Sequence, residues 1–159
     1  MRRTAASGTF RVAVMTVYAE PLGVVIIDDS EEVRAALALV IGAQSDLKLL
    51  GAASGVTEGV GMVRRLYPDV VVLDVNMPDG GGQRAAHEMT AAAPEVRIIA
   101  FSAFDKALIR KVMTAAGADA YVSKSGHISE LLAAIRGARN PGMPEGSPVA
   151  KSGVPWSDD

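Results

Sequence analysis

The chain has 159 residues, a formal net charge of −2, no cysteine and two histidines. A charge balance this close to neutral provides no basic footprint for nucleic acid and no polybasic arm for a membrane surface. The lack of cysteine excludes a disulfide framework, a thiolate zinc site and a cysteine nucleophile, and the shortage of histidine disfavours a histidine-based metal centre. Because 49% of the residues are hydrophobic, the chain is apolar enough to form one domain with a sizeable core.

The two ends of the chain differ in composition from its middle. Residues 1–20 place Arg2 and Arg3 before an apolar run, VAVMTV (12–17), that is too short for the core of a signal peptide, so we predict a poorly ordered leader. Residues 140–159 are rich in proline and glycine and predict a disordered tail or linker. The folded domain is expected over residues 21–139, and no stretch approaches the roughly 18 apolar residues of a membrane span.

Between these ends, short apolar runs alternate with segments of helical periodicity. The first run, VVII (24–27), stops at Asp28 and Asp29, and Ser30 then stands where a helix N-cap is expected. Pro68 is expected to stop the second helix. In chain order, the sequence predicts strands over 24–27, 47–54, 70–73, 96–102 and 119–124, and helices over 30–44, 57–67, 82–93, 106–118 and 128–138.

Continuous apolar strands that alternate with helices predict a parallel sheet covered by helices on both faces. Right-handed crossovers between five strand–helix units then produce a doubly wound α/β sandwich, (βα)5. We take the strand order as 2-1-3-4-5, in which strands one and three are neighbours at the point where the order reverses. Ligands of such sheets bind beyond the carboxyl ends of the strands, so residues at those ends are the candidates for a functional site.

Charged and hydroxyl side chains stand at four of these five strand ends. Asp28 and Asp29 follow the first strand, Asp74 the third, Ser102 the fourth and Lys124 the fifth. Three converging carboxylates repel one another, and a divalent cation with hard oxygen ligands, Mg²⁺ above all, relieves that repulsion. The lysine and the serine suit phosphoryl oxygens, and the third aspartate can act as a nucleophile toward phosphorus.

Taken singly, each of these residues has an ordinary structural interpretation. The two aspartates after the first strand could cap the following helix, the serine could be a loop residue, and the lysine a surface residue. Tyr121 is most simply a packing residue, and His87 and His127 are expected to face solvent or cap helices. The joint placement of the right groups at separate strand ends favours a phosphoryl-transfer site over these separate interpretations.

With these residues in view, the sequence resembles the receiver domain of bacterial two-component response regulators over residues 23–138. The acidic pair, the phosphoacceptor loop, the hydroxyl position and the aromatic-plus-lysine segment of that family are matched by IIDDS (26–30), VVLDVNMPDGGG (71–82), FSAF (101–104) and AYVSK (120–124). Ser125, which follows the lysine, and SELLAAIRGA (129–138) are similar to the LuxR/NarL-like branch. The resemblance implies a flavodoxin-like fold and the role of a signalling switch.

The resemblance also implies how the acidic residues divide their work. Asp74 would accept a phosphoryl group from a sensor histidine kinase or a phosphotransfer protein. Asp29, Asp74 and the backbone carbonyl of Asn76 would bind Mg²⁺ directly, and Asp28 would act mainly through water. The chain would catalyse its own phosphorylation and dephosphorylation in a limited sense, without being a metabolic enzyme.

Ser102 and Lys124 would bind the phosphoryl oxygens, and movement of Ser102 would let Tyr121 turn inward. That movement would reshape the face formed by residues 106–118, 119–124 and 128–138, a two-state element biased by a charge event. The partners implied are the phosphoryl donor, a downstream effector protein or domain, and a second copy of the chain on activation. Direct contact with nucleic acid or a membrane is not expected, and the cytoplasm is the expected compartment.

Two departures from the family pattern and two alternatives accompany this interpretation. Ser125 stands where many receivers have a proline after the lysine, and Ser102 replaces the commoner threonine but keeps the hydroxyl. Regulators with the Ser125 variant usually carry a helix-turn-helix, for which the residues after 139 are too few, so the chain is either a stand-alone receiver or lacks its output domain. An aspartate-nucleophile phosphohydrolase is disfavoured because Asn76 stands where such enzymes need a second acid. A degenerate receiver that acts as a phosphorylation-independent interaction module remains the main alternative.

Overall fold

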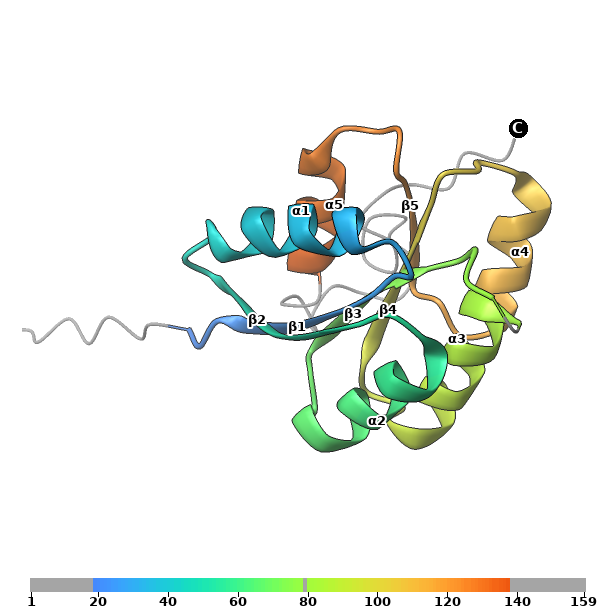
Figure 1. Cartoon of the computed structure of the whole chain (residues 1–159), viewed down its shortest axis with the longest axis horizontal. Coiled ribbons are helices and arrows are strands. Elements are labelled where there is room, and N and C mark those ends of the chain that lie inside the picture. Colours follow the sequence, from blue (N-terminus) through green and yellow to red (C-terminus); the bar gives the residue numbers. More distant parts are fainter. Residues whose placement is uncertain (1–18, 79, 138–159) are drawn as a thin grey trace, which may run out of the picture.

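The computed structural model describes residues 19–78 and 80–137, which form a single layered α/β unit (Figure 1). The predictions for the leader up to residue 18 and for residues 140–159 lie outside these ranges. In chain order the elements are β1 (Leu22–Ile27), α1 (Glu31–Gly42), β2 (Leu47–Ala53), α2 (Val56–Leu66), β3 (Val70–Asp74), α3 (Gly81–Ala92), β4 (Arg97–Ser102), α4 (Ala107–Ala115), β5 (Ala120–Ser123) and α5 (Ile128–Arg136).

The five strands form one sheet in the order β2-β1-β3-β4-β5, and every neighbouring pair is parallel. This confirms the predicted doubly wound, flavodoxin-like architecture. The register pairs Ile27 of β1 with Leu73 of β3, and Asp74 of β3 with Phe101 of β4. The carboxyl ends of the three central strands therefore meet at one edge of the sheet, with β5 ending beside β4.

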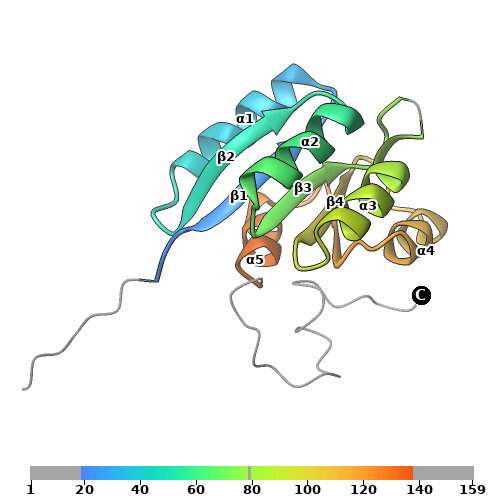
Figure 2. The same ribbon diagram turned by 90° about the horizontal axis from the view of Figure 1, so that it is seen from below.

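Helices cover both faces of the sheet, with α1 and α5 on one side and α2, α3 and α4 on the other (Figures 1 and 2). Successive strand residues point to opposite faces, so one strand supplies both cores. In β1, Val25 and Ile27 pack with α2 and α3, whereas Val24 and Ile26 pack with α1 and α5. Burial on both faces is the physical reason why the strands are continuously apolar.

The element boundaries show where sequence periodicity is least informative. Ser30 caps α1 as predicted, since its side chain accepts a hydrogen bond from Val33 N at 3.3 Å. β1 begins at Leu22 rather than at residue 24, because pairing with Leu47 of β2 starts there. The second helix runs from Val56 to Leu66 instead of 57 to 67, and Tyr67 ends it in the left-handed conformation with φ 47°.

None of the helices within the described ranges combines the length and the apolar character that crossing a bilayer requires.

The half-buried carboxylate of Asp119 secures the start of β4 against β5. Ile98 N donates to Asp119 Oδ2 at 2.8 Å, and Asp119 N donates to Ile98 O at 2.8 Å. Burial raises the pKa of Asp119, although the hydrogen bond from Ile98 and the charge of Arg97 oppose this. The side chain therefore completes the strand pairing, at the cost of holding a charge away from water.

We expect Asp119→Ala to lower the free energy of unfolding by about 1–3 kcal/mol, because it leaves the Ile98 N–H without its acceptor. Asp119→Asn keeps an acceptor oxygen and removes the buried charge, so its stability at neutral pH should match that of the wild type. The folded protein holds the Asp119 proton more tightly than the unfolded chain does, so wild-type stability relative to Asp119→Asn falls as pH rises through the raised pKa. Urea unfolding of both variants at several pH values tests this, and equal losses would contradict it.

Candidate functional site

The fold brings the predicted site residues together at the carboxyl edge of the sheet. Asp28 follows β1, Asp74 ends β3, Ser102 ends β4 and Lys124 follows β5. Asp28 is 1% exposed, Asp74 is 3% exposed and Ser102 is fully buried, although all three side chains are polar. Polar groups buried to this degree need partners, and their contacts define the site.

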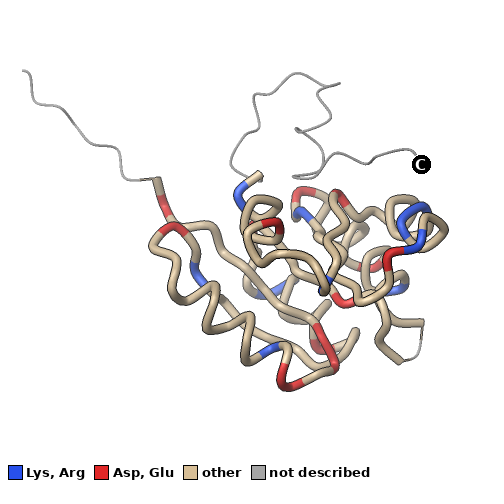
Figure 3. The backbone as a smooth tube through the Cα atoms, turned by 90° about the horizontal axis from the view of Figure 1, so that it is seen from above, with Lys and Arg blue, Asp and Glu red and all other residues tan. Residues whose placement is uncertain are grey.

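Three carboxylates gather there. Oxygen atoms of Asp28, Asp29 and Asp74 all lie within 4.8 Å of one another. Asp29 is exposed, while the other two are buried, so the cluster opens to solvent on one side. Figure 3 shows the same acidic stretch where β1 ends and α1 begins. Hard oxygen donors with room for water fit Mg²⁺, which binds through one or two carboxylates and completes its shell with water or phosphate.

Lys124 supplies the positive charge in this cluster. Its Nζ lies 2.7 Å from Asp28 Oδ2 and 3.3 Å from Asp74 Oδ1. Burial lowers the pKa of Lys124, but the hydrogen bond to Asp28 and the charges of Asp74 and Asp28 outweigh it, so the pKa is raised. Lys124 therefore remains charged and bridges the ends of β1 and β3 from the end of β5.

The pKa of Asp74 is raised mainly by burial and further by the charge of Asp28. The hydrogen bond from Asn76 N, at 3.1 Å to Oδ1, and the charge of Lys124 oppose that shift. Because one oxygen is held by both of these partners, the carboxylate has a defined orientation. An oriented carboxylate at a partly open edge is suited to attack an electrophile approaching from solvent.

Glycines after β3 let the β3–α3 loop fold tightly against the strand. Gly80 and Gly81 have φ values of 82° and 46°, in the left-handed region that favours glycine. Gly82 N donates to Val75 O at 3.2 Å. A Cβ on Gly82 would lie 2.6 Å from Asp74 O, so the close approach of α3 to the end of β3 requires glycine.

Tyr121 and its neighbours form a second set of contacts beside the cluster. Tyr121 is 3% exposed, its hydroxyl donates to Phe104 O, and the Arg110 guanidinium lies 5.3 Å from the ring centroid. The Tyr121 ring is thus already buried in this structure, and its inward movement on phosphorylation stays a prediction. Tyr121 belongs to the larger hydrophobic core, on the face of the sheet that α2, α3 and α4 cover.

Both histidines are exposed, as the sequence predicted, and neither belongs to the acidic cluster. A groove of about 350 Å³ opens beside that cluster and is lined by residues such as Asp29, Thr57, Met77 and Arg84. Sequence reasoning missed this groove, because its walls come from residues after β1, β2 and β3 and from the first turns of α2 and α3, which only the fold brings together.

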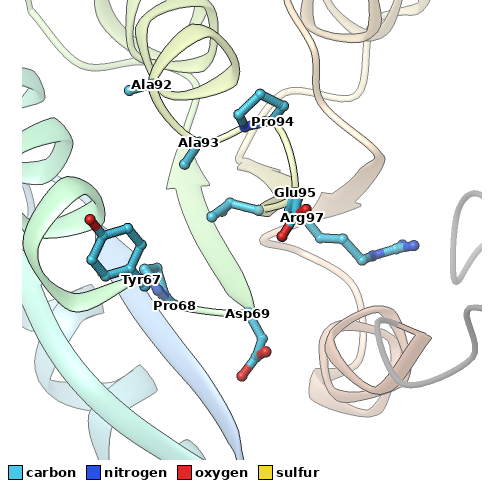
Figure 4. Close-up of a pocket in the computed structure, with 9 residues that line it drawn as sticks. Tyr67, Pro68, Asp69, Ala92, Ala93, Pro94, Glu95 and Arg97 are labelled. Carbon is cyan, nitrogen blue, oxygen red and sulfur yellow. The ribbon is translucent and has the colours of Figure 1, made fainter.

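A larger pocket of about 540 Å³ lies far from this chemistry, between the α2–β3 and α3–β4 connections. Figure 4 shows Tyr67, Pro68 and Asp69 on one side of it and Pro94 and Arg97 on the other. These residues precede the strands instead of following them, so the pocket opens at the edge of the sheet opposite the acidic cluster. The size of a pocket therefore does not locate the functional site in this fold.

Comparisons with known proteins agree with this geometry. Residues 24–136 match the family described as the response regulator receiver domain. The chain is 34% identical over 115 residues to the DNA-binding transcriptional activator DevR/DosR of Mycobacterium tuberculosis, which covers 71% of this chain and 52% of that protein. It is 35% identical over 116 residues to the transcriptional regulatory protein LiaR of Bacillus subtilis, with coverage of 72% and 54%.

Among solved structures, a two-component response regulator of the LuxR family from Aurantimonas sp. superimposes with a TM-score of 0.71 and 26% sequence identity, covering 74% of this chain and 84% of that one. The chain spans about half the length of the curated relatives it matches. The strand order, the acidic cluster and these matches lead to one conclusion: the chain belongs to the family of response regulator receiver domains, and its relatives include LuxR-type regulators.

Proposed function

We propose that Asp74 accepts a phosphoryl group in a Mg²⁺-dependent step. The observation that carries the proposal is the convergence of one oriented, buried carboxylate, two further carboxylates and the Lys124 ammonium at a single edge of the sheet. Phosphoryl transfer depends mostly on positioning and on neutralising charge, and this arrangement provides both. Membership of the receiver family supports the same chemistry.

In the proposed reaction, an oxygen of Asp74 forms a bond to phosphorus while the bond from phosphorus to the donor breaks. The electron pair of that bond leaves with the donor, which is the imidazole of a phosphohistidine or the acetate of acetyl phosphate. Asp28, Asp29, Asp74 and the carbonyl of Asn76 would hold Mg²⁺, directly or through water, and the bound ion would supply positive charge to the phosphoryl oxygens. The acyl phosphate is later hydrolysed by water.

The side chains of Lys124 and Ser102 would contact the phosphoryl oxygens of the product. Lys124 Nζ is already within 3.3 Å of Asp74 Oδ1, so a small movement brings its charge to a group attached there. The expected consequence is a change in the face formed by α4, β5 and α5, where Tyr121 is packed. In this proposal the protein switches when the added charge of the phosphoryl group on Asp74 changes the shape of that face.

The proposed partners are a sensor histidine kinase or a phosphotransfer protein upstream and an effector protein or domain downstream, in the cytoplasm. A homodimer formed on activation is part of the same proposal. The name of one relative, a DNA-binding activator, describes a protein about twice as long as the matched segment. We therefore assign DNA contact, if the full system has any, to an output domain and not to this receiver.

Intact-mass measurement after incubation with acetyl phosphate, with and without Mg²⁺, tests the function. The expected result is a Mg²⁺-dependent gain of one phosphoryl group per chain. Chelation of Mg²⁺ should abolish the gain without unfolding the protein. No gain under either condition would contradict the proposal and favour an interaction module that works without phosphorylation.

Replacing Lys124 should separate its structural and chemical roles. Lys124→Met keeps much of the apolar stem but leaves buried Asp28 without its cation, so the free energy of unfolding should fall by about 3 kcal/mol without Mg²⁺. Phosphorylation should slow by about a hundredfold, since a charge aimed at the phosphoryl oxygens is lost. Added Mg²⁺ should recover more stability in this variant than in the wild type, because the ion can neutralise the same carboxylates.

Lys124→Arg is the matched control, because it keeps the charge while changing the geometry. Urea unfolding with and without Mg²⁺, and phosphorylation time courses by mass, provide the two readouts. A Lys124→Met protein with unchanged stability and unchanged phosphorylation would show that the 2.7 Å contact to Asp28 has neither role.

A further inference from the structure

The side chain of Asn76 contacts a residue from a different strand end. Its Nδ2 lies 3.2 Å from Ser102 Oγ, across 26 residues of sequence. The backbone N–H of the same residue donates to Asp74 Oδ1 at 3.1 Å. Asn76 therefore touches both the proposed phosphoryl acceptor and the proposed switch hydroxyl, the first through its backbone and the second through its side chain.

The hydrogen bonds of Ser102 leave little choice for the direction of its proton. Ser102 is fully buried, and its Oγ accepts from Asn76 Nδ2 at 3.2 Å and from Phe104 N at 3.2 Å. A hydroxyl oxygen has two acceptor sites and one hydrogen to donate, so two incoming N–H groups fill its acceptor sites. The remaining O–H must then point away from both donors.

Tyr121 lies in the neighbourhood of that hydroxyl. Burial raises the pKa of Tyr121, and hydrogen bonding with Ser102 opposes the shift. The tyrosine hydroxyl itself donates to Phe104 O, and Phe104 N donates to Ser102. The orientation of the Ser102 hydroxyl therefore depends on two further contacts, one with Phe104 of the β4–α4 loop and one with Tyr121.

We propose that the carboxamide of Asn76 is a positioning residue that orients the Ser102 hydroxyl for the phosphoryl group on Asp74. By filling one acceptor site of Ser102, its N–H holds the hydroxyl beside the β3–α3 loop. The Ser102 proton then points away from Asn76 and can pass from its contact with Tyr121 to a phosphoryl oxygen. The contact between Asn76 and Ser102 also links the β3–α3 loop to the end of β4. This role of the side chain rests on the proposed function and is separate from metal binding by the Asn76 backbone carbonyl.

The residue type at position 76 suits this role. Asn76 is exposed, so its side chain is not held in place by packing, and the contact to buried Ser102 fixes its orientation. An aspartate there would offer no N–H and would add a fourth carboxylate to the cluster. An alanine would remove the N–H that fills one acceptor site of the fully buried Ser102 hydroxyl, and the hydroxyl would lose the contact that fixes its orientation.

A double-mutant cycle tests the coupling, using Asn76→Ala, Ser102→Ala and the double variant. The rate of phosphorylation by acetyl phosphate at saturating Mg²⁺ is followed by intact mass. We expect Asn76→Ala to slow the reaction about fivefold, the effect of one hydrogen bond, and to have no further effect when Ser102 is already alanine. The Mg²⁺ concentration for half-maximal rate should not change, because the substitution keeps the backbone carbonyl.

Two controls make the outcome specific. Thr57→Ala changes a side chain that lines the neighbouring groove without contacting Ser102, and it should leave the rate unchanged. Ser102→Thr keeps the hydroxyl, so Asn76→Ala should again slow the reaction in that background. Full additivity of the two alanine effects, or a shift in the Mg²⁺ dependence instead of the rate, would overturn the inference.

Failure of the proposed function would look different. If the wild type gains no phosphoryl group, the function itself is wrong and Asn76 has no reaction to support. If the wild type is phosphorylated normally and the cycle shows no coupling, only the role of Asn76 fails. Urea unfolding of the same four proteins is an independent readout, in which the contact should appear as non-additive stability changes without any phosphoryl donor.

Discussion

Asp74→Asn is expected to abolish Mg²⁺-dependent phosphorylation. An amide is not a nucleophile toward phosphorus, and loss of the nucleophile in a comparable covalent site reduces turnover by about 10³-fold or more. The expected mass spectrum after incubation with acetyl phosphate and Mg²⁺ shows a single unmodified species. The wild type, treated in parallel, should gain one phosphoryl group.

The substitution should leave the fold intact, which makes its result interpretable. Burial and the charge of Asp28 both raise the pKa of Asp74, so the ionised carboxylate is held in an unfavourable environment. The amide oxygen of the variant can still accept the hydrogen bond from Asn76 N, which in the wild type is 3.1 Å from Asp74 Oδ1. Lys124 also keeps its 2.7 Å contact with Asp28. Unfolding in urea should therefore require at least as much denaturant as the wild type.

Glu95→Gln is a suitable control, because it neutralises an exposed acid in the pocket at the opposite edge of the sheet. This variant should be phosphorylated at the wild-type rate. If Asp74→Asn were labelled as fully as the wild type, the acceptor would have to be another residue and the site assignment would be wrong. Fragmentation of the labelled protein would then identify that residue.

Gly82→Ala is the substitution for which we expect the largest loss of stability in the acceptor loop. An alanine Cβ at this position would lie 2.6 Å from Asp74 O and 2.7 Å from Val75 Cα. Both are backbone atoms, so no side-chain rotation relieves the contact, and either α3 or the end of β3 must shift. We expect the free energy of unfolding to fall by about 3 kcal/mol. Phosphorylation should fall as well, because the displaced backbone carries Asp74, the proposed acceptor.

Gly61→Ala provides the matched comparison for this effect. Gly61 lies inside α2, and a Cβ there meets no heavy atom within 4 Å. Alanine favours the helix and restricts the unfolded chain, so this variant should gain about 0.5–1 kcal/mol. Opposite signs for the two glycine-to-alanine changes in urea unfolding are the expected result. A loss of similar size in both would mean that the close approach at Gly82 is not the cause.

The sequence by itself determined the architecture and the identity of the chemical groups at the site. Runs such as VVII and VVVL are apolar at every position because both faces of the sheet are covered, and this pattern predicts parallel strands. Parallel strands end at one edge, so a polar residue directly after each run must join its counterparts there. That geometric rule predicts that Asp28, Asp74, Ser102 and Lys124 lie together, as they do in the fold.

The tertiary structure decided how these groups are connected. Lys124 reaches Asp28 across 96 residues, Asn76 reaches Ser102 across 26, and Arg136 reaches Asp46 across 90. Such contacts depend on strand register and on rotamers, and no periodicity in the sequence encodes them. The buried position of Tyr121 and the start of β1 at Leu22 have the same origin, since burial and strand pairing are set by neighbours distant in the chain.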